Sequence, residues 1–90
     1  MTCGGLTVLI VDDEANMRRI LEATLGREGY RAVTAENGTE ALAILKQQPV
    51  HIVLTDLKMP GIDGMTLLRE CTAEYPDIPL IMLTAHGTVE

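Results

Sequence analysis

Four short apolar runs alternate along the chain with three segments of helical periodicity. The first run, TVLIV, is continuous and rich in β-branched residues, which is typical of a strand covered on both faces. The second run is half polar, which predicts a strand at the edge of a sheet. The predicted strands span residues 7–11, 30–35, 51–56 and 78–84.

The segments between these runs repeat apolar residues at three- and four-residue intervals, the spacing of amphipathic helices. They span residues 15–27, 37–49 and 63–75. Gly29 suits the end of the first helix, and the second opens at Asn-Gly and closes before Pro49. Asp63 is the predicted N-cap of the third helix.

The helical spacing also predicts which side chains face the core. In the first helix we expect Arg18, Arg19 and Glu22 on the solvent side. The inward side of that helix should carry Met17, Ile20, Leu21, Thr24 and Leu25. The inward side of the third should carry Met65, Leu68 and either Cys71 or Thr72.

The element order, strand and helix in strict alternation, predicts parallel strands joined by right-handed crossovers. We therefore expect a doubly wound α/β fold with a parallel sheet. Ninety residues suffice for one domain, which we assign to residues 1–90. Sites in such folds lie beyond the carboxyl ends of the strands.

Oxygen-bearing side chains stand where the strands end. Asp12 and Asp13 follow the first strand, Asp56 ends the third, and Thr84 ends the fourth. Parallel strands bring these ends to one edge, where carboxylates repel one another unless a cation joins them. Hard oxygen ligands suit Mg²⁺. The alternative for Asp12 or Asp13 is a helix N-cap, whereas Asp56 lies too far ahead of its helix for that role.

Composition narrows the function classes. The net charge is −6, with no Lys/Arg stripe, which argues against direct nucleic-acid binding and fits a cation or a basic partner. Cys3 and Cys71 form no CxxC pair and no secretory signal precedes them, so we expect reduced thiols and a cytoplasmic location. No apolar run is long enough to span a membrane. We interpret His51 and His86 as solvated or core-edge residues rather than metal ligands.

Three motifs resemble the receiver domain of two-component response regulators: VLIVDDE (8–14), VLTDLKMPGIDG (53–64) and LIMLTA (80–85). The resemblance implies a flavodoxin-like receiver fold. It also implies that Asp56 accepts a phosphoryl group from the phosphohistidine of a sensor histidine kinase. By the same resemblance, Asp13 is a direct Mg²⁺ ligand and Asp12 holds the metal through water.

The resemblance assigns further positions around the phosphoryl group. The backbone carbonyl of Lys58 completes the Mg²⁺ site. The Thr84 hydroxyl contacts the phosphoryl oxygen, as does the backbone N–H of Ala85. The Lys58 side chain and His86 occupy positions associated in the family with the lifetime of the acyl phosphate.

The family's fifth strand and fifth helix, with a lysine that contacts the phosphoryl group, fall outside these 90 residues. We therefore expect a C-terminally incomplete receiver in which Asp56 is phosphorylated slowly or not at all. The fourth strand, residues 78–84, would then be a bare apolar edge, which predicts self-association.

The tail LTAHGTVE resembles receivers of the nitrogen-regulator class. In that class a sigma-54-activating ATPase and a DNA-binding helix-turn-helix follow, so the output is transcription. Two alternatives stay open. A phosphatase with an aspartyl nucleophile would need a DxD spacing that VDDE lacks, so we expect no turnover enzyme. A phosphorylation-incompetent docking or dimerisation module is the other.

Overall fold

Four parallel strands form one sheet in the order β2-β1-β3-β4. The structure, a computed structural model, describes residues 5–56 and 64–83. Its strands are β1 (Thr7–Val11), β2 (Arg31–Ala35), β3 (Ile52–Asp56) and β4 (Leu80–Leu83). Its helices are α1 (Ala15–Arg27), α2 (Gly38–Gln47) and α3 (Gly64–Glu74). The predicted α/β class, the parallel pairing and the edge position of the second strand are confirmed.

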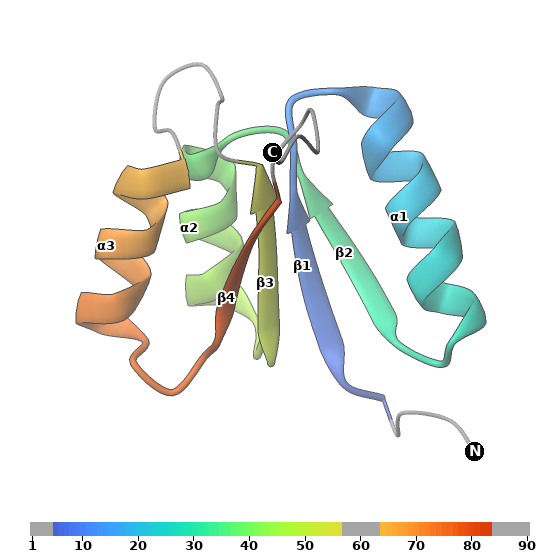
Figure 1. The fold of residues 1–90 in the computed structure, drawn as a ribbon. Coiled ribbons are helices and arrows are strands. Elements are labelled where there is room, and N and C mark those ends of the chain that lie inside the picture. Colours follow the sequence, from blue (N-terminus) through green and yellow to red (C-terminus); the bar gives the residue numbers. More distant parts are fainter. Residues whose placement is uncertain (1–4, 57–63, 84–90) are drawn as a thin grey trace, which may run out of the picture.

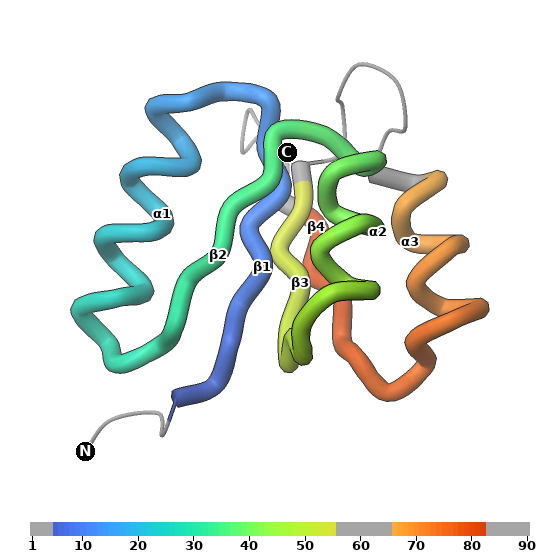
Figure 2. The backbone as a smooth tube through the Cα atoms, turned by 180° about the vertical axis from the view of Figure 1, so that it is seen from behind, coloured from blue at the N-terminus to red at the C-terminus, as the bar shows by residue number. Residues whose placement is uncertain are grey.

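The helices lie on both faces of the sheet. The chain moves from β1 to β2 in one direction and then from β2 through β3 to β4 in the other. Because every crossover is right-handed, this reversal sends α1 to one face and α2 and α3 to the opposite face (Figure 1). The view from behind shows the same two layers around the strands (Figure 2).

Strand β1 is central and fully buried, as its continuous apolar run predicts. Leu9 pairs with Val33 of β2 on one side and with Val53 of β3 on the other. Successive side chains alternate between faces, so Leu9 and Val11 face α2 and α3 while Ile10, between them, faces α1.

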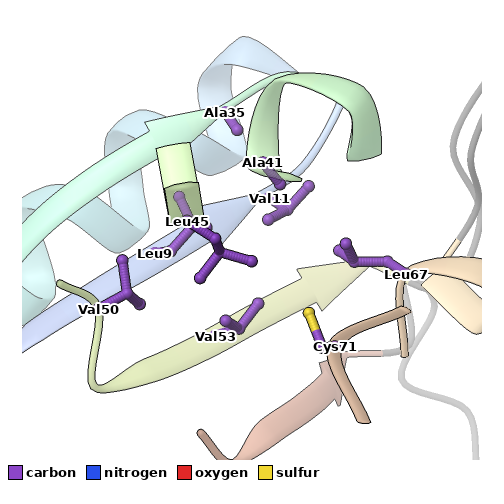
Figure 3. Packing of buried hydrophobic residues seen from close by; sticks show 9 residues of the cluster. All are labelled: Leu9, Val11, Ala35, Ala41, Leu45, Val50, Val53, Leu67 and Cys71. Carbon is purple, nitrogen blue, oxygen red and sulfur yellow. The ribbon is translucent and has the colours of Figure 1, made fainter. Parts of the chain in front are cut away.

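The main core lies between the sheet and the α2–α3 layer. Figure 3 shows side chains of β1, β2 and β3 meeting those of α2 and α3. The cluster comprises Leu9, Val11, Ala35, Ala41, Leu45, Val50, Val53, Leu67 and Cys71. No aromatic ring lies among these buried members, so close packing of branched aliphatic side chains supplies the apolar contact.

Local signals in the sequence set the helix ends. Gly29 has φ of 96° and ends α1, with the Gly29 N–H donating to the Gly26 carbonyl at 3.1 Å. Tyr30 N–H donates to the Leu25 carbonyl at 3.1 Å, which completes a Schellman motif. At the start of α2, Asn37 Oδ1 accepts the Glu40 N–H at 2.8 Å, an N-cap bond.

The predicted inward face of α1 is partly wrong. Met17, Leu21 and Leu25 are half-buried against the sheet, whereas Ile20 is 58% exposed and Thr24 is exposed. The three half-buried residues are spaced by four, so they form one narrow stripe, and Ile20 lies about 100° around the helix from Leu21. Helix α1 therefore contacts the sheet along a single line of side chains.

In α3 the spacing identified Cys71 but missed the deepest residue. Leu67 is fully buried, Leu68 is half-buried and Thr72 is exposed. Leu67 and Cys71 are four residues apart and face the core together (Figure 3). Asp63 and the side chain of Met65 lie outside the described residues.

The Cys71 thiol is free and buried in the core. Burial raises the pKa of this thiol, and the negative charge of Glu70 raises it further. Cys3 lies outside the described residues. Among the helices that are described, none combines the length and the apolar composition needed to cross a membrane.

Candidate functional site

The candidate site lies at the carboxyl end of the sheet, between β1 and β3. The chain leaves these neighbouring strands in opposite directions, toward β2 and toward β4, which makes this edge the topological switch point of the fold (Figure 1). The last pair of the β1–β3 ladder is Val11 with Thr55. Asp12 follows Val11 just after β1 and Asp56 is the last residue of β3, so the parallel register sets the backbones of these two residues side by side.

Asp12 is anchored by three parts of the fold. Its N–H donates to the carbonyl of Ala35 at the end of β2, at 3.1 Å. Its Oδ1 accepts the Glu14 N–H at 2.9 Å, which closes a local turn. Its carbonyl accepts a hydrogen bond from Arg18 Nη1 at 2.7 Å. Asp12 is only 7% exposed, so these bonds hold a carboxylate at the inner end of the edge.

Asp13 has the opposite environment. It is exposed, and no hydrogen bond or ion pair ties its carboxylate to the described part of the chain. Within residues 12–14, which we call the acid turn, the Asp12 carboxylate is thus anchored while that of Asp13 is open to a ligand. That pairing differs from a plain loop, where both acids would be solvated.

Helix capping does not explain these acids. The N-cap of α1 is Glu14, which makes no side-chain capping bond. The alternative in which Asp12 or Asp13 caps α1 is therefore wrong. Asp12 Oδ1 accepts the N–H of Glu14, the N-cap residue, whereas a capping side chain accepts an N–H from within the first turn of the helix. The carboxylates remain to be explained by something other than the helix.

Several predicted site residues lie outside the described part of the chain. These are Lys58, Thr84, Ala85 and His86, and of Asp56 only the backbone is described. Strand β4 nevertheless reaches the same edge, since its last residue, Leu83, pairs with Asp56.

His51 lies at the other end of the sheet from the acids. It is exposed, its Nδ1 accepts the Thr7 N–H at 2.9 Å, and its own N–H donates to the Thr7 carbonyl at 2.8 Å. This imidazole therefore ties the starts of β1 and β3 together, which agrees with the interpretation of His51 as a core-edge residue.

The donor chemistry of the edge fits Mg²⁺. No group of three metal-ligating side chains occurs within residues 5–56 and 64–83. Asp12 and Asp13 supply two carboxylates from one turn, and the β1–β3 register brings the backbone of Asp56 beside them. Carboxylate oxygens with room for water match a small, hard cation that retains part of its hydration shell.

Hydrophobic spacing did not identify one residue that holds the site. Arg18 was assigned to the solvent side of α1, yet it is half-buried and bonded to the Asp12 carbonyl. Helical side chains tilt toward the helix N-terminus, so a long side chain in the first turns reaches back toward the preceding loop. This directional rule, rather than hydrophobic spacing, is the signal that could have identified Arg18.

Comparison with known families agrees with the fold. Residues 8–90 match the response regulator receiver domain family, and the chain belongs to that family. It is a receiver domain of the kind found in two-component transcriptional regulators.

Two curated relatives illustrate the match. The chain is 43% identical over 82 residues to the transcriptional regulatory protein GlrR of Escherichia coli K12, covering 91% of this chain and 18% of GlrR. It is 39% identical over 83 residues to the DNA-binding transcriptional regulator NtrC of Salmonella typhimurium, covering 92% of this chain and 18% of NtrC. The chain thus spans less than a fifth of these relatives. The presence of NtrC among these relatives agrees with the resemblance of the tail LTAHGTVE to the nitrogen-regulator class.

Solved structures show the same fold. The response regulator TrrA of Thermotoga maritima, in complex with Mg²⁺ and BeF, has a TM-score of 0.86 at 40% identity, covering 91% of this chain and 71% of TrrA. TrrA in complex with the histidine kinase ThkA has a TM-score of 0.86 at 39% identity, covering 94% of this chain and 73% of that one.

Proposed function

We propose that this receiver accepts a phosphoryl group on Asp56 from a sensor histidine kinase and thereby controls a transcriptional output in the cytoplasm. The observation that carries the proposal is the position of Asp56 at the switch point, one register step beyond the Val11–Thr55 pair and beside the anchored Asp12. A histidine kinase bound to the similar regulator TrrA supports the choice of partner. The relative NtrC, a DNA-binding transcriptional regulator, supports a transcriptional output. Following the resemblance of the tail LTAHGTVE to the nitrogen-regulator class, this output would run through a sigma-54-activating ATPase and a helix-turn-helix in other parts of a longer protein.

In this proposal an Asp56 carboxylate oxygen forms an O–P bond while the P–N bond of the kinase phosphohistidine breaks, and the released imidazole takes up a proton. Asp12, Asp13, Asp56 and the Lys58 carbonyl would hold Mg²⁺, which offsets charge on the transferred group when bound. The Thr84 hydroxyl and the Ala85 N–H would donate to the phosphoryl oxygens. Positioning and charge neutralisation carry the reaction, since a carboxylate is a weak nucleophile.

The domain acts once per phosphorylation in this proposal, so it is a phosphoacceptor rather than a turnover enzyme. Residues 1–90 would belong to one receiver unit that binds neither nucleic acid nor membrane by itself. The comparisons give no support to a pure docking and dimerisation module.

Phosphorylation is tested at Asp56. We expect the chain, incubated with a small phosphodonor and Mg²⁺, to gain the mass of one phosphoryl group, and the modified peptide to contain Asp56. Asp56→Asn should abolish this product because a carboxamide does not form the acyl phosphate. End-point mass spectrometry detects the product even when it forms slowly.

Asp77→Asn is the matched control, since Asp77 is an exposed acid just before β4. It should leave the phosphoryl yield unchanged. Equal modification of the wild-type chain and Asp56→Asn would refute Asp56 as the acceptor. No modification of the wild-type chain would refute slow phosphorylation of these 90 residues and favour a phosphorylation-incompetent receiver.

We also propose that the β4 edge supports self-association. Strand β4 lies at the end of the described sheet, and Ile81 on it is 48% exposed. An edge strand with an exposed apolar residue is a template for pairing with another chain. Light scattering should show an apparent mass that rises with protein concentration.

Ile81→Lys should suppress that rise, because a charge on an edge strand opposes pairing. Ile20→Lys introduces the same change at a 58% exposed position on α1 and should leave the rise intact. A wild-type chain that stays monomeric at high concentration, or equal suppression by both variants, would contradict pairing through β4.

A further inference from the structure

One side chain connects helix α1 to the acid turn. Arg18 Nη1 donates to the carbonyl of Asp12 at 2.7 Å, the shortest of the three hydrogen bonds described for Asp12. The acceptor is a backbone oxygen, so the contact fixes the path of the chain between the two acids. A hydrogen bond from a charged donor is shorter and stronger than one between neutral groups.

The local fold explains why residue 18 reaches this oxygen. The Arg18 N–H donates to the Glu14 carbonyl at 3.1 Å, so Arg18 lies one helical turn above the acid turn. Side chains in a helix point toward its N-terminus, and a half-buried arginine stem is long enough to extend from there to Asp12. The neighbouring Arg19 is exposed, and no hydrogen bond joins its side chain to the described residues.

In the other hydrogen bonds described for the acid turn, the donor is a backbone N–H. Its internal bond runs from the Glu14 N–H to Asp12 Oδ1, and Glu14 caps α1 without a side-chain bond. Asp13, between them, has no bond of its own to the described residues. Three described bonds reach outside the turn's own residues. The Asp12 N–H donates to Ala35 of β2, the Glu14 carbonyl accepts the backbone N–H of Arg18, and the Asp12 carbonyl accepts from the Arg18 side chain. Arg18 is therefore the side chain that holds the exit of the turn.

We propose that Arg18 is a positioning residue: by holding the Asp12 carbonyl, it fixes the acid turn so that Asp12 and Asp13 present their carboxylates together to the cation. This inference rests on the proposed function for the cation itself. The proposal predicts that loss of Arg18 changes the affinity for the cation in the direction opposite to that expected from its charge alone. Removing a nearby positive charge would tighten cation binding, whereas releasing the turn weakens it.

Arg18→Met tests the proposal, with Arg19→Met as the matched loss of one charge at the next position. We expect Arg18→Met to weaken Mg²⁺ binding, measured by calorimetric titration, by about tenfold, as for other partners that orient metal ligands. Arg19→Met should change it by less than about twofold, since exposed charges are screened by salt.

Amide hydrogen exchange of the metal-free chain is the second measurement. In Arg18→Met the Glu14 amide should exchange faster than in the wild-type chain, because its bond to Asp12 Oδ1 is no longer held. The Val53 amide, which donates to the Pro79 carbonyl at 3.0 Å, should stay protected and so report an intact core. If Val53 also loses protection, Arg18→Leu, which likewise has no donor, is measured in place of Arg18→Met, with the same expectations.

Unchanged or tighter Mg²⁺ binding in the folded variant would overturn the proposal, and so would an unchanged Glu14 exchange rate. A wild-type chain that binds no Mg²⁺ would instead refute the proposed function. In that case Glu14 exchange still decides whether Arg18 holds the turn.

Discussion

Replacing Leu9 by alanine is expected to lower the free energy of unfolding by about 2–5 kcal/mol, the range for truncating buried leucines. Leu9 is 0% exposed, and its strand has a partner on both sides, with Val33 and Val53 directly opposite. Because β1 is paired on both sides, the strand cannot shift to fill the cavity that the shorter side chain leaves. Domains of this kind are stable by roughly 0.05–0.15 kcal/mol per residue, so this single change would remove a large part of the total.

Leu6→Ala is the matched control for that prediction. Leu6 makes the same chemical change three residues earlier, but it is 38% exposed and precedes the strand. Its loss should be no more than about 1 kcal/mol, because surface truncations leave little cavity. Urea unfolding of the three proteins, with equal m-values, measures both losses. Equal costs for Leu6→Ala and Leu9→Ala would contradict a core centred on β1.

The core around Leu9 also shows what the sequence pattern could predict. A continuous apolar run in a parallel sheet is typical of a buried strand, so β1 was predicted with its observed ends. Gly29 and the residue before Pro49 restrict the backbone directly, so the ends of α1 and α2 followed within two residues. Local rules sufficed for these elements.

Burial on the helices followed less well, because it depends on where each helix rests. Spacing placed Ile20 on the inward face, but α1 contacts the sheet only along the line of Met17, Leu21 and Leu25. Spacing likewise chose Leu68 over Leu67, since two adjacent leucines differ only in the direction of the neighbouring layer. Neither direction is encoded in the helix itself.

The candidate site likewise has a part that the sequence pattern predicts and a part that depends on tertiary contacts. Parallel strands alone predict that Asp12 and Asp56 meet at one edge, and the β1–β3 register is consistent with that. The bonds that anchor Asp12 come from Ala35 and Arg18, which are distant in sequence or assigned to solvent by spacing. Such contacts require the tertiary arrangement, so the difference between a buried Asp12 and an exposed Asp13 could not be predicted.

That difference leads to the second large effect, in Asp13→Asn. We expect this variant to bind Mg²⁺ at least about 100-fold more weakly, because Asp13 is a direct ligand in the proposed site and its loss should exceed the effect of losing an outer partner. Its metal-free stability should stay equal or rise. Asp13 is exposed and makes no hydrogen bond with the described residues, so no described contact of the native state is lost with its charge. Removing this charge also relieves its repulsion with the Asp12 carboxylate.

Thermal unfolding with and without Mg²⁺ measures both parts of this prediction. A ligand that binds the native state alone stabilises it by about 2.7 kcal/mol at 100 times its Kd, so the wild-type Tm should rise as Mg²⁺ is added. The Tm of Asp13→Asn should start no lower and should not respond at the same Mg²⁺ concentration.

Glu14→Gln removes the same charge from the next residue and serves as the control. Glu14 is exposed and makes no side-chain capping bond, so its Tm should rise with Mg²⁺ nearly as in the wild-type chain. If Asp13→Asn and Glu14→Gln lose the Mg²⁺ response equally, the metal senses only the summed charge of the acid turn. If only Asp13→Asn loses it, the cation is bound by a particular carboxylate, and the fixed geometry of the turn becomes the property that binding depends on.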